Sequence, residues 1–275
     1  MKKNGLLLLS FLFLLAGTAH EFWLEPQAFI VSRGEEINIR FRVGEQFTGE
    51  NWSGNRERIQ QLQLFYAEVT DDLSEQVSEH KGDSLQFTFY EEGTALVCFQ
   101  STNSFLELDA EKFRQYLEED GLTNALQYRQ EHQETDSAGR EYYQRSVKTL
   151  LQVGHVTTNV YQKRTSLPLD LVPMSHPYRI TKPDTMALQI FFRNEPASNL
   201  KVRVWKKLTG KLTTTELVSD STGTVRFAVQ PEGEWMVSCV QMIRLPDDPK
   251  AQWQSYWGSI TWGYTGKAVR SATSR

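Results

Sequence analysis

The sequence predicts a mostly β protein with two tandem β-sandwich domains, the second Ig-like and the first carrying a helical insertion. Three observations support this prediction. Residues 36–43 alternate apolar and polar side chains, which is the period of a half-buried strand. About six or seven short strand-like segments follow residue 165, at a spacing typical of an Ig-like sandwich. Between these two regions, apolar residues within 105–147 recur at helical spacing.

The first domain, residues 20–165, opens with several strand patterns separated by turn-rich pieces. In 36–43 the alternation places Ile37, Ile39, Phe41 and Val43 on one buried face. The same pattern returns in 62–66 and 85–89, and a more fully apolar strand is expected at 95–99. Short strands linked by such turns favour an antiparallel sandwich.

The helical insertion is expected at about 105–147. Asp109 is a plausible N-cap, and Gly121 suits the position just after a helix. A second helix is expected from Thr123 to about His132. A third helical stretch is expected before the chain returns to strand at 150–153, and it includes Glu141, Tyr142, Tyr143 and Arg145.

Two prolines mark the boundary between the domains. Pro168 and Pro173 bracket a short extended segment, and the residue before a proline is biased away from helix. The second domain, residues 166–275, then shows strand patterns at 187–192, 201–205, 212–218, 224–229 and 234–242.

Residues 1–19 have the features of a signal peptide. Lys2 and Lys3 form a positive start, 6–15 is apolar except for Ser10, and Gly17-Thr18-Ala19 supplies small residues for cleavage. No later apolar run is long enough for a membrane helix. We therefore expect a periplasmic or secreted protein that has no transmembrane span once the signal is removed.

Charge and cysteine content narrow the function. The chain carries −4, and removal of 1–19 deletes two lysines and no acid, so the mature chain carries −6. Such acidity disfavours nucleic acid as a partner, because phosphate binding needs a clustered basic face. Cys98 and Cys239 lie in apolar strand patterns and are expected to be buried hydrophobes, with a disulfide between them disfavoured.

Cleavage after Ala19 makes His20 the new N-terminus. A free α-amine and an imidazole on one residue can chelate a metal together, and copper and nickel are the natural candidates. The alternative is that His20 is an ordinary residue of an N-terminal strand. A metal site needs further donors, and His155 and His176 are the candidates. His80 and His132 lie in charged stretches and are expected to face solvent.

The C-terminal stretch is rich in aromatic residues, and two interpretations are open. An exposed row of aromatic rings would form a binding platform for sugars or proteins. Alternation offers the simpler account, in which one face of a strand over 254–264 packs the core. The residues concerned are Trp253, Tyr256, Trp257, Trp262 and Tyr264.

Enzyme motifs are missing from the sequence. It has no GxSxG nucleophile elbow, no HExxH zinc helix and no phosphate-binding P-loop. The carboxylates at 118–120 lie at the end of the expected first helix, where they form a solvated face. No catalytic residues are selected, and we expect a protein that is not an enzyme.

Several segments together resemble the DUF4198 family of secreted bacterial proteins, which is also described as NikM-like and associated with nickel uptake. The matching segments span nearly the whole mature chain: AHEFWLEP at 19–26, LELD at 106–109, REYY at 140–143, KTLLQVG at 148–154, LDLVP at 169–173, HPY at 176–178, GEWM at 233–236 and WQSYWGS at 253–259.

The resemblance implies an envelope protein that serves metal uptake or handling, with one nickel, cobalt or copper ion as cargo and a metal-transport or envelope complex as partner. It carries over no catalytic residue. The rival hypothesis is a non-catalytic envelope module that binds carbohydrate or a protein partner. The two differ in whether His20 meets His155 or His176, or whether aromatic rings line the surface.

Overall fold

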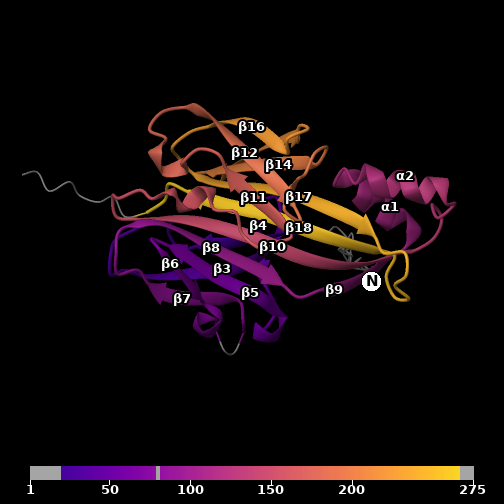
Figure 1. The fold of residues 1–275 in the computed structure, drawn as a ribbon, viewed down its shortest axis with the longest axis horizontal. Helices are drawn as coiled ribbons and strands as arrows, with labels where there is room; N and C mark the ends of the chain where they lie inside the picture. Colours follow the sequence, from indigo (N-terminus) through magenta and orange to yellow (C-terminus); the bar gives the residue numbers. More distant parts are fainter. Residues whose placement is uncertain (1–19, 79–80, 267–275) are drawn as a thin grey trace, which may run out of the picture.

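The computed structural model describes residues 20–78 and 81–266, so the predicted signal peptide and His80 lie outside the described residues. Strands dominate the fold, and two smaller sheets pack as layers on a long central one. In Figure 1 the strands of the first half lie below, those of the second half lie above, and two helices stand at one end. The described helices are too short or too polar to cross a membrane. The predicted mostly β, sandwich-type fold is confirmed.

The central sheet joins strands from both halves of the chain. Its main path runs β15-β14-β17-β18-β10-β8-β5-β6, and β2 and β9 also pair with β10. The strands are β2 (Ile30–Val31), β5 (Ile59–Tyr66), β6 (Val69–Asp72), β8 (Gly93–Ser101), β9 (Ser104–Leu108), β10 (Gly139–Val153), β14 (Lys201–Leu208), β15 (Lys211–Val218), β17 (Glu234–Arg244) and β18 (Trp253–Gly263).

One face of the central sheet is covered by a small N-terminal sheet. It consists of β1 (Glu21–Pro26), β3 (Glu36–Glu45), β4 (Thr48–Asn51) and β7 (Ser84–Thr88), with β3 in the middle. The alternation predicted at 36–43 is confirmed, because Ile37, Ile39 and Phe41 are fully buried. They pack against central-sheet residues such as Val97 and Leu151.

The other face of the central sheet is covered by a C-terminal sheet. It contains β11 (Leu169–Pro173), β12 (Asp184–Phe192), β13 (Glu195–Pro196) and β16 (Thr224–Val229). Its apolar residues form one core with both halves of the central sheet, from Leu96 and Leu150 to Val237 and Ile260. The two predicted sandwiches therefore share their middle sheet, which contains strands from both sides of the predicted domain boundary.

Two helices cover the rest of the face that carries the N-terminal sheet. Helix α1 (Ala110–Glu119) begins after Asp109, whose side chain accepts from the Lys112 N–H at 2.9 Å. It ends at Glu119, and Gly121 follows the C-cap with φ +67°, so the predicted cap and stop are confirmed. Helix α2 (Thr123–Glu131) follows, and both helices pack on Val240, Met242, Trp253 and Trp257.

The predicted third helix is wrong. Residues 141–145 belong to β10, which pairs antiparallel with β9 and parallel with β18. Backbone bonding on both edges outweighs the weak helical signal of this segment, since local propensity yields to tertiary context. The helical part of the insertion is therefore limited to residues 110–131.

A buried ion pair ties the central sheet to the C-terminal sheet. Lys148 of β10 contacts Asp170 of β11, and both are nearly inaccessible to solvent. The Lys148 ammonium also donates to the Leu171 carbonyl at 3.2 Å, and Asp170 Oδ2 accepts from the Thr165 N–H at 2.7 Å. Solvent reaches neither charge, so each depends on the other and on these hydrogen bonds for stabilisation.

We expect Lys148→Met to lower the free energy of unfolding by about 3–5 kcal/mol, because it leaves the Asp170 carboxylate buried without its cation. The double variant Lys148→Met, Asp170→Asn should recover most of that loss, since the amide still accepts from Thr165. Urea unfolding of the variants measures both effects. A double variant no more stable than the single one would contradict this account.

Candidate functional site

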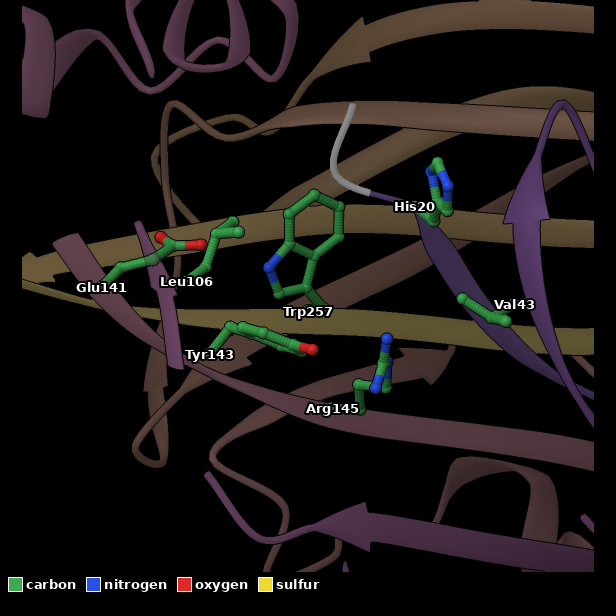
Figure 2. Close-up of a pocket in the computed structure, with 7 residues that line it drawn as sticks. All are labelled: His20, Val43, Leu106, Glu141, Tyr143, Arg145 and Trp257. Carbon is green, nitrogen blue, oxygen red and sulfur yellow. The ribbon is translucent and has the colours of Figure 1, made fainter. Parts of the chain in front are cut away.

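A pocket opens where the start of β1 meets the helical end of the molecule. It has a volume of about 160 Å³. Figure 2 shows its walls, with the Trp257 ring between Leu106 and His20 and the Arg145 guanidinium below His20. The lining residues are His20, Val43, Leu106, Glu141, Tyr143, Arg145 and Trp257.

Strand alternation explains how β10 supplies three of these side chains. Glu141, Tyr143 and Arg145 are two residues apart, so they point to the same face of the sheet. Trp257 of β18 lies opposite Arg145 in the parallel register. The same face of β10 continues into the core under the N-terminal sheet with Val147 and Leu151. The pocket therefore fills the gap between that sheet and the helices.

Arg145 is the main charge of the pocket. It is 9% exposed, and none of the ion pairs within residues 20–78 and 81–266 includes it. Its guanidinium lies over the rings of Phe22 and Tyr143, at 4.8 and 5.1 Å from their centres. Burial lowers the pKa of Arg145, Tyr143 beside it opposes this shift, and the nearby cation Arg58 adds to it. The pocket is thus electropositive at this end.

Glu141 stands at the opposite end of the pocket. It is fully buried, and burial raises its pKa to about 8 against the lowering effect of hydrogen bonds from Ser255 and Tyr116. The Tyr116 hydroxyl lies 3.2 Å from Glu141 Oε2. Glu141 therefore holds its proton at neutral pH and adds no negative charge to balance Arg145.

A second, polar recess of about 130 Å³ lies on the other side of the start of β1. Burial raises the pKa of Glu21 to about 7 and that of Asp120 to about 6. Arg203 contacts Asp120 and lies 4.0 Å from Glu21, which opposes both shifts. Glu45 lines the same recess. Acidic groups therefore surround the residue that precedes β1.

His20 lies at the rim between these two cavities. Its Nδ1 is 3.3 Å from Oε1 of Glu45, and both side chains are between 40 and 50% exposed. The strand pairing explains the contact, because Glu21 lies opposite Gly44 at the C-terminal end of β3. The sequence selected His20, but nothing in it identified Glu45 as its neighbour.

The three histidines proposed as metal ligands do not come together. His155 follows β10, and His176 contacts Thr94, which pairs with Gln152 near the end of β10. His20 shares its pocket with Arg145, which precedes Val153 at the end of β10 by eight residues. Eight residues of a β-strand span roughly 26 Å, so His20 lies far from the strand end that His155 and His176 approach. Within the described ranges, no group of three or more His, Cys, Asp or Glu residues could hold a metal ion.

His176 has a structural environment instead. It is buried, and its Nδ1 accepts from the Tyr178 N–H at 3.1 Å. Its Nε2 therefore carries the proton and donates to Thr94 Oγ1 at 2.9 Å or the Thr158 carbonyl at 3.1 Å. Burial lowers the pKa of His176 to about 4, so the ring stays neutral and both nitrogens are used.

His155 and His132 are exposed, as is their surrounding backbone. His132 stacks on Tyr128 with ring centres 3.8 Å apart, which agrees with its expected place at the surface. The aromatic residues of β18 are core residues, since Trp253, Tyr256, Trp257 and Trp262 are at most 8% exposed. They form no exposed row, so the simpler interpretation by alternation is confirmed. Both cysteines are free and buried.

Sequence reasoning missed the residues that give the pocket its charge. Glu141, Tyr143 and Arg145 were assigned to a helix, where they would not share a face. No local signal separated helix from strand here, because two tyrosines lie between polar residues in Glu141-Tyr142-Tyr143-Gln144-Arg145 and the segment has no clear period.

A protein-family model described as a domain of unknown function, DUF4198, matches residues 17–243. No curated protein matches the chain. The D0–D1 domain of intimin is 10% identical, with 87% of this chain and 97% of that chain covered and a TM-score of 0.21. A bacterial ice-binding adhesin is 11% identical over 90% of this chain and 64% of its own, with a TM-score of 0.23.

The buried carboxyl group predicts a pH-dependent stability. Glu141 keeps its proton to about pH 8 when folded but loses it near its ordinary value of 4.5 when unfolded. The folded state thus binds one more proton between these values, and stability falls as pH rises through this window. Glu141→Gln should remove the share of this fall in stability that the Glu141 carboxyl causes, which is on the order of 3 kcal/mol between pH 5 and pH 8.

Urea unfolding at both pH values checks this expectation. Exposed Glu107 on the neighbouring strand β9 provides a control, since Glu107→Gln should change stability equally at both pH values. A Glu141→Gln gain that does not grow with pH would show that the carboxyl is ionised in the fold.

His176→Ala should destabilise the fold by about 2–3 kcal/mol, because it orphans the Tyr178 N–H and removes the hydrogen bond that the ring donates to Thr94 or Thr158. It should leave any uptake of Cu²⁺ unchanged. Urea unfolding and a copper titration of the same variant measure the two effects. A weaker copper affinity without loss of stability would make His176 a ligand.

Proposed function

The chain belongs to the DUF4198 family, and we propose that it is a secreted, non-enzymatic envelope protein that holds one transition-metal ion at His20. The observation that carries the proposal is the pairing of His20 with Glu45 at the surface. The signal-like residues 1–19 support export and cleavage before His20. In this model the protein carries nickel, cobalt or copper for uptake or handling by an envelope complex.

The atoms at His20 suit such an ion. An N-terminal histidine chelates through its α-amine and its own Nδ1, and Nδ1 is the nitrogen that faces Glu45. Amine, imidazole and carboxylate together give two nitrogens and one oxygen, a donor set that suits Cu²⁺ or Ni²⁺. Water or a ligand would complete the coordination. The half-exposed side chains leave the ion accessible from outside.

Glu45 takes the place that the sequence analysis gave to a second histidine. His155 and His176 lie at the far end of β10, so neither completes the chelate. Glu21 and Asp120 line the recess that Glu45 also lines, together with Arg203, which contacts Asp120. The uptake of a divalent ion would in turn favour the ionised forms of these acids.

The test uses protein secreted from its own signal, with its start fixed by intact mass. We expect one equivalent of Cu²⁺ or Ni²⁺ to bind to a chain that starts at His20. An alanine inserted before His20 should weaken binding by about a hundredfold, because it removes the amine from the chelate ring. Glu45→Gln should weaken it by about tenfold, since the amide is a poorer ligand.

Glu50→Gln on the adjacent strand β4 is the matched control, because it removes an exposed acid without touching His20. It should leave the metal affinity unchanged. Equal affinity of the inserted and natural chains would exclude the N-terminal chelate. A correct start with no metal uptake would favour the rival function, a non-catalytic module that binds a carbohydrate or protein partner.

A further inference from the structure

The pocket beneath His20 contains a buried cation, Arg145, that forms no ion pair with any residue in the described part of the chain. Arg145 is nine-tenths buried, and its neighbours in the pocket are aromatic, aliphatic or, at Glu141, a protonated acid. An unpaired charge out of water costs several kcal/mol. Proteins keep such groups mainly where a ligand supplies the missing partner. Arg145 lines open space, so a ligand can reach it.

The walls of the pocket indicate what accompanies the anion. Trp257 lines one side, and its other face stacks on Tyr116 with ring centres 5.9 Å apart. Tyr143 lies next to the Arg145 guanidinium, and its hydroxyl points toward it in Figure 2. Leu106 and Val43 complete an apolar lining. Such surfaces suit a planar, apolar body.

We propose that this pocket binds a small organic carboxylate, whose carboxylate pairs with the Arg145 guanidinium and whose planar body lies against Trp257 and Tyr143. A guanidinium and a carboxylate match as two parallel hydrogen bonds. A phosphate dianion fits less well, because the pocket offers it one buried arginine and no second buried cation. Arg58, which lies outside the pocket lining, adds a second positive charge near Arg145.

The size of the pocket limits the ligand. A volume of about 160 Å³ holds several water molecules, and one aromatic ring with a carboxylate is a ligand of that scale. The proposal thus commits to a small acid, whereas the rival function would bind a larger carbohydrate.

The anion site goes beyond the metal site and does not depend on it. Arg145, Tyr143 and Trp257 come from β10 and β18, whereas the metal donors come from the N-terminus and β3. Measurements in a chelator remove the ion and leave the anion site intact. The experiments can therefore show that one proposal is wrong without testing the other.

The experiment uses the secreted chain in EDTA, with benzoate and the neutral benzyl alcohol as probes of the same shape. Saturation-transfer NMR and titration measure binding. We expect benzoate to bind at millimolar concentration or below, and about tenfold or more tightly than benzyl alcohol, because only the carboxylate pairs with Arg145. This comparison needs no variant, so it holds whether or not a variant folds.

Arg145→Gln should then abolish the preference for benzoate over benzyl alcohol. Arg193→Gln is the matched control, since Arg193 also lies over aromatic rings, at 5.2 Å from Phe192, but outside the pocket. It should keep the preference. Equal binding of the two probes, no binding of benzoate, or a preference that survives in folded Arg145→Gln would each overturn the proposal.

Discussion

The parallel pairing of β10 with β18 is the constraint on which the rest of the structure depends. It joins residues 141–149 to residues 253–261, one segment from each predicted domain, and makes one sheet out of strands that would otherwise form two. Both faces of these strands are buried, so one carries the N-terminal sheet and the helices while the other carries the C-terminal sheet. A parallel pair cannot be closed by a hairpin, and residues 150–252 serve as its connection.

The pocket is a consequence of that arrangement. One face of β10 is covered at one end by helices and further along by a sheet, and the two covers do not meet. Arg145 and Glu141 lie in the gap between them, where side chains face partly open space rather than a packed core. Hydrophobic burial elsewhere holds the strand in place, so the sheet tolerates one uncompensated cation there. His20 reaches the rim because β1, which follows it, pairs with β3 in the sheet that forms one side of the gap.

Local patterns predicted those parts of the fold in which neighbours along the chain decide the structure. The alternation of 36–43 identified β3, and Asp109 and Gly121 located the ends of α1. Alternation also assigned Tyr256 and Trp262 to the core. The same reasoning failed for 141–145, because a run of two tyrosines between polar residues fits helix or strand equally well. The strand is selected by hydrogen bonds to β9 and β18, and those partners lie more than thirty and more than a hundred residues away in sequence.

The sequence by itself determined the mostly β class, the helical insertion, the resemblance to DUF4198 and the interest of His20, because period, caps and an N-terminal motif are properties of short segments. Only the tertiary structure decided which groups meet. It separated His155 and His176 from His20, placed Glu45 beside His20, and showed that Arg145 is a buried cation that lines a pocket. Contacts between distant strands depend on sheet order and register, and no local pattern of residues encodes either of them.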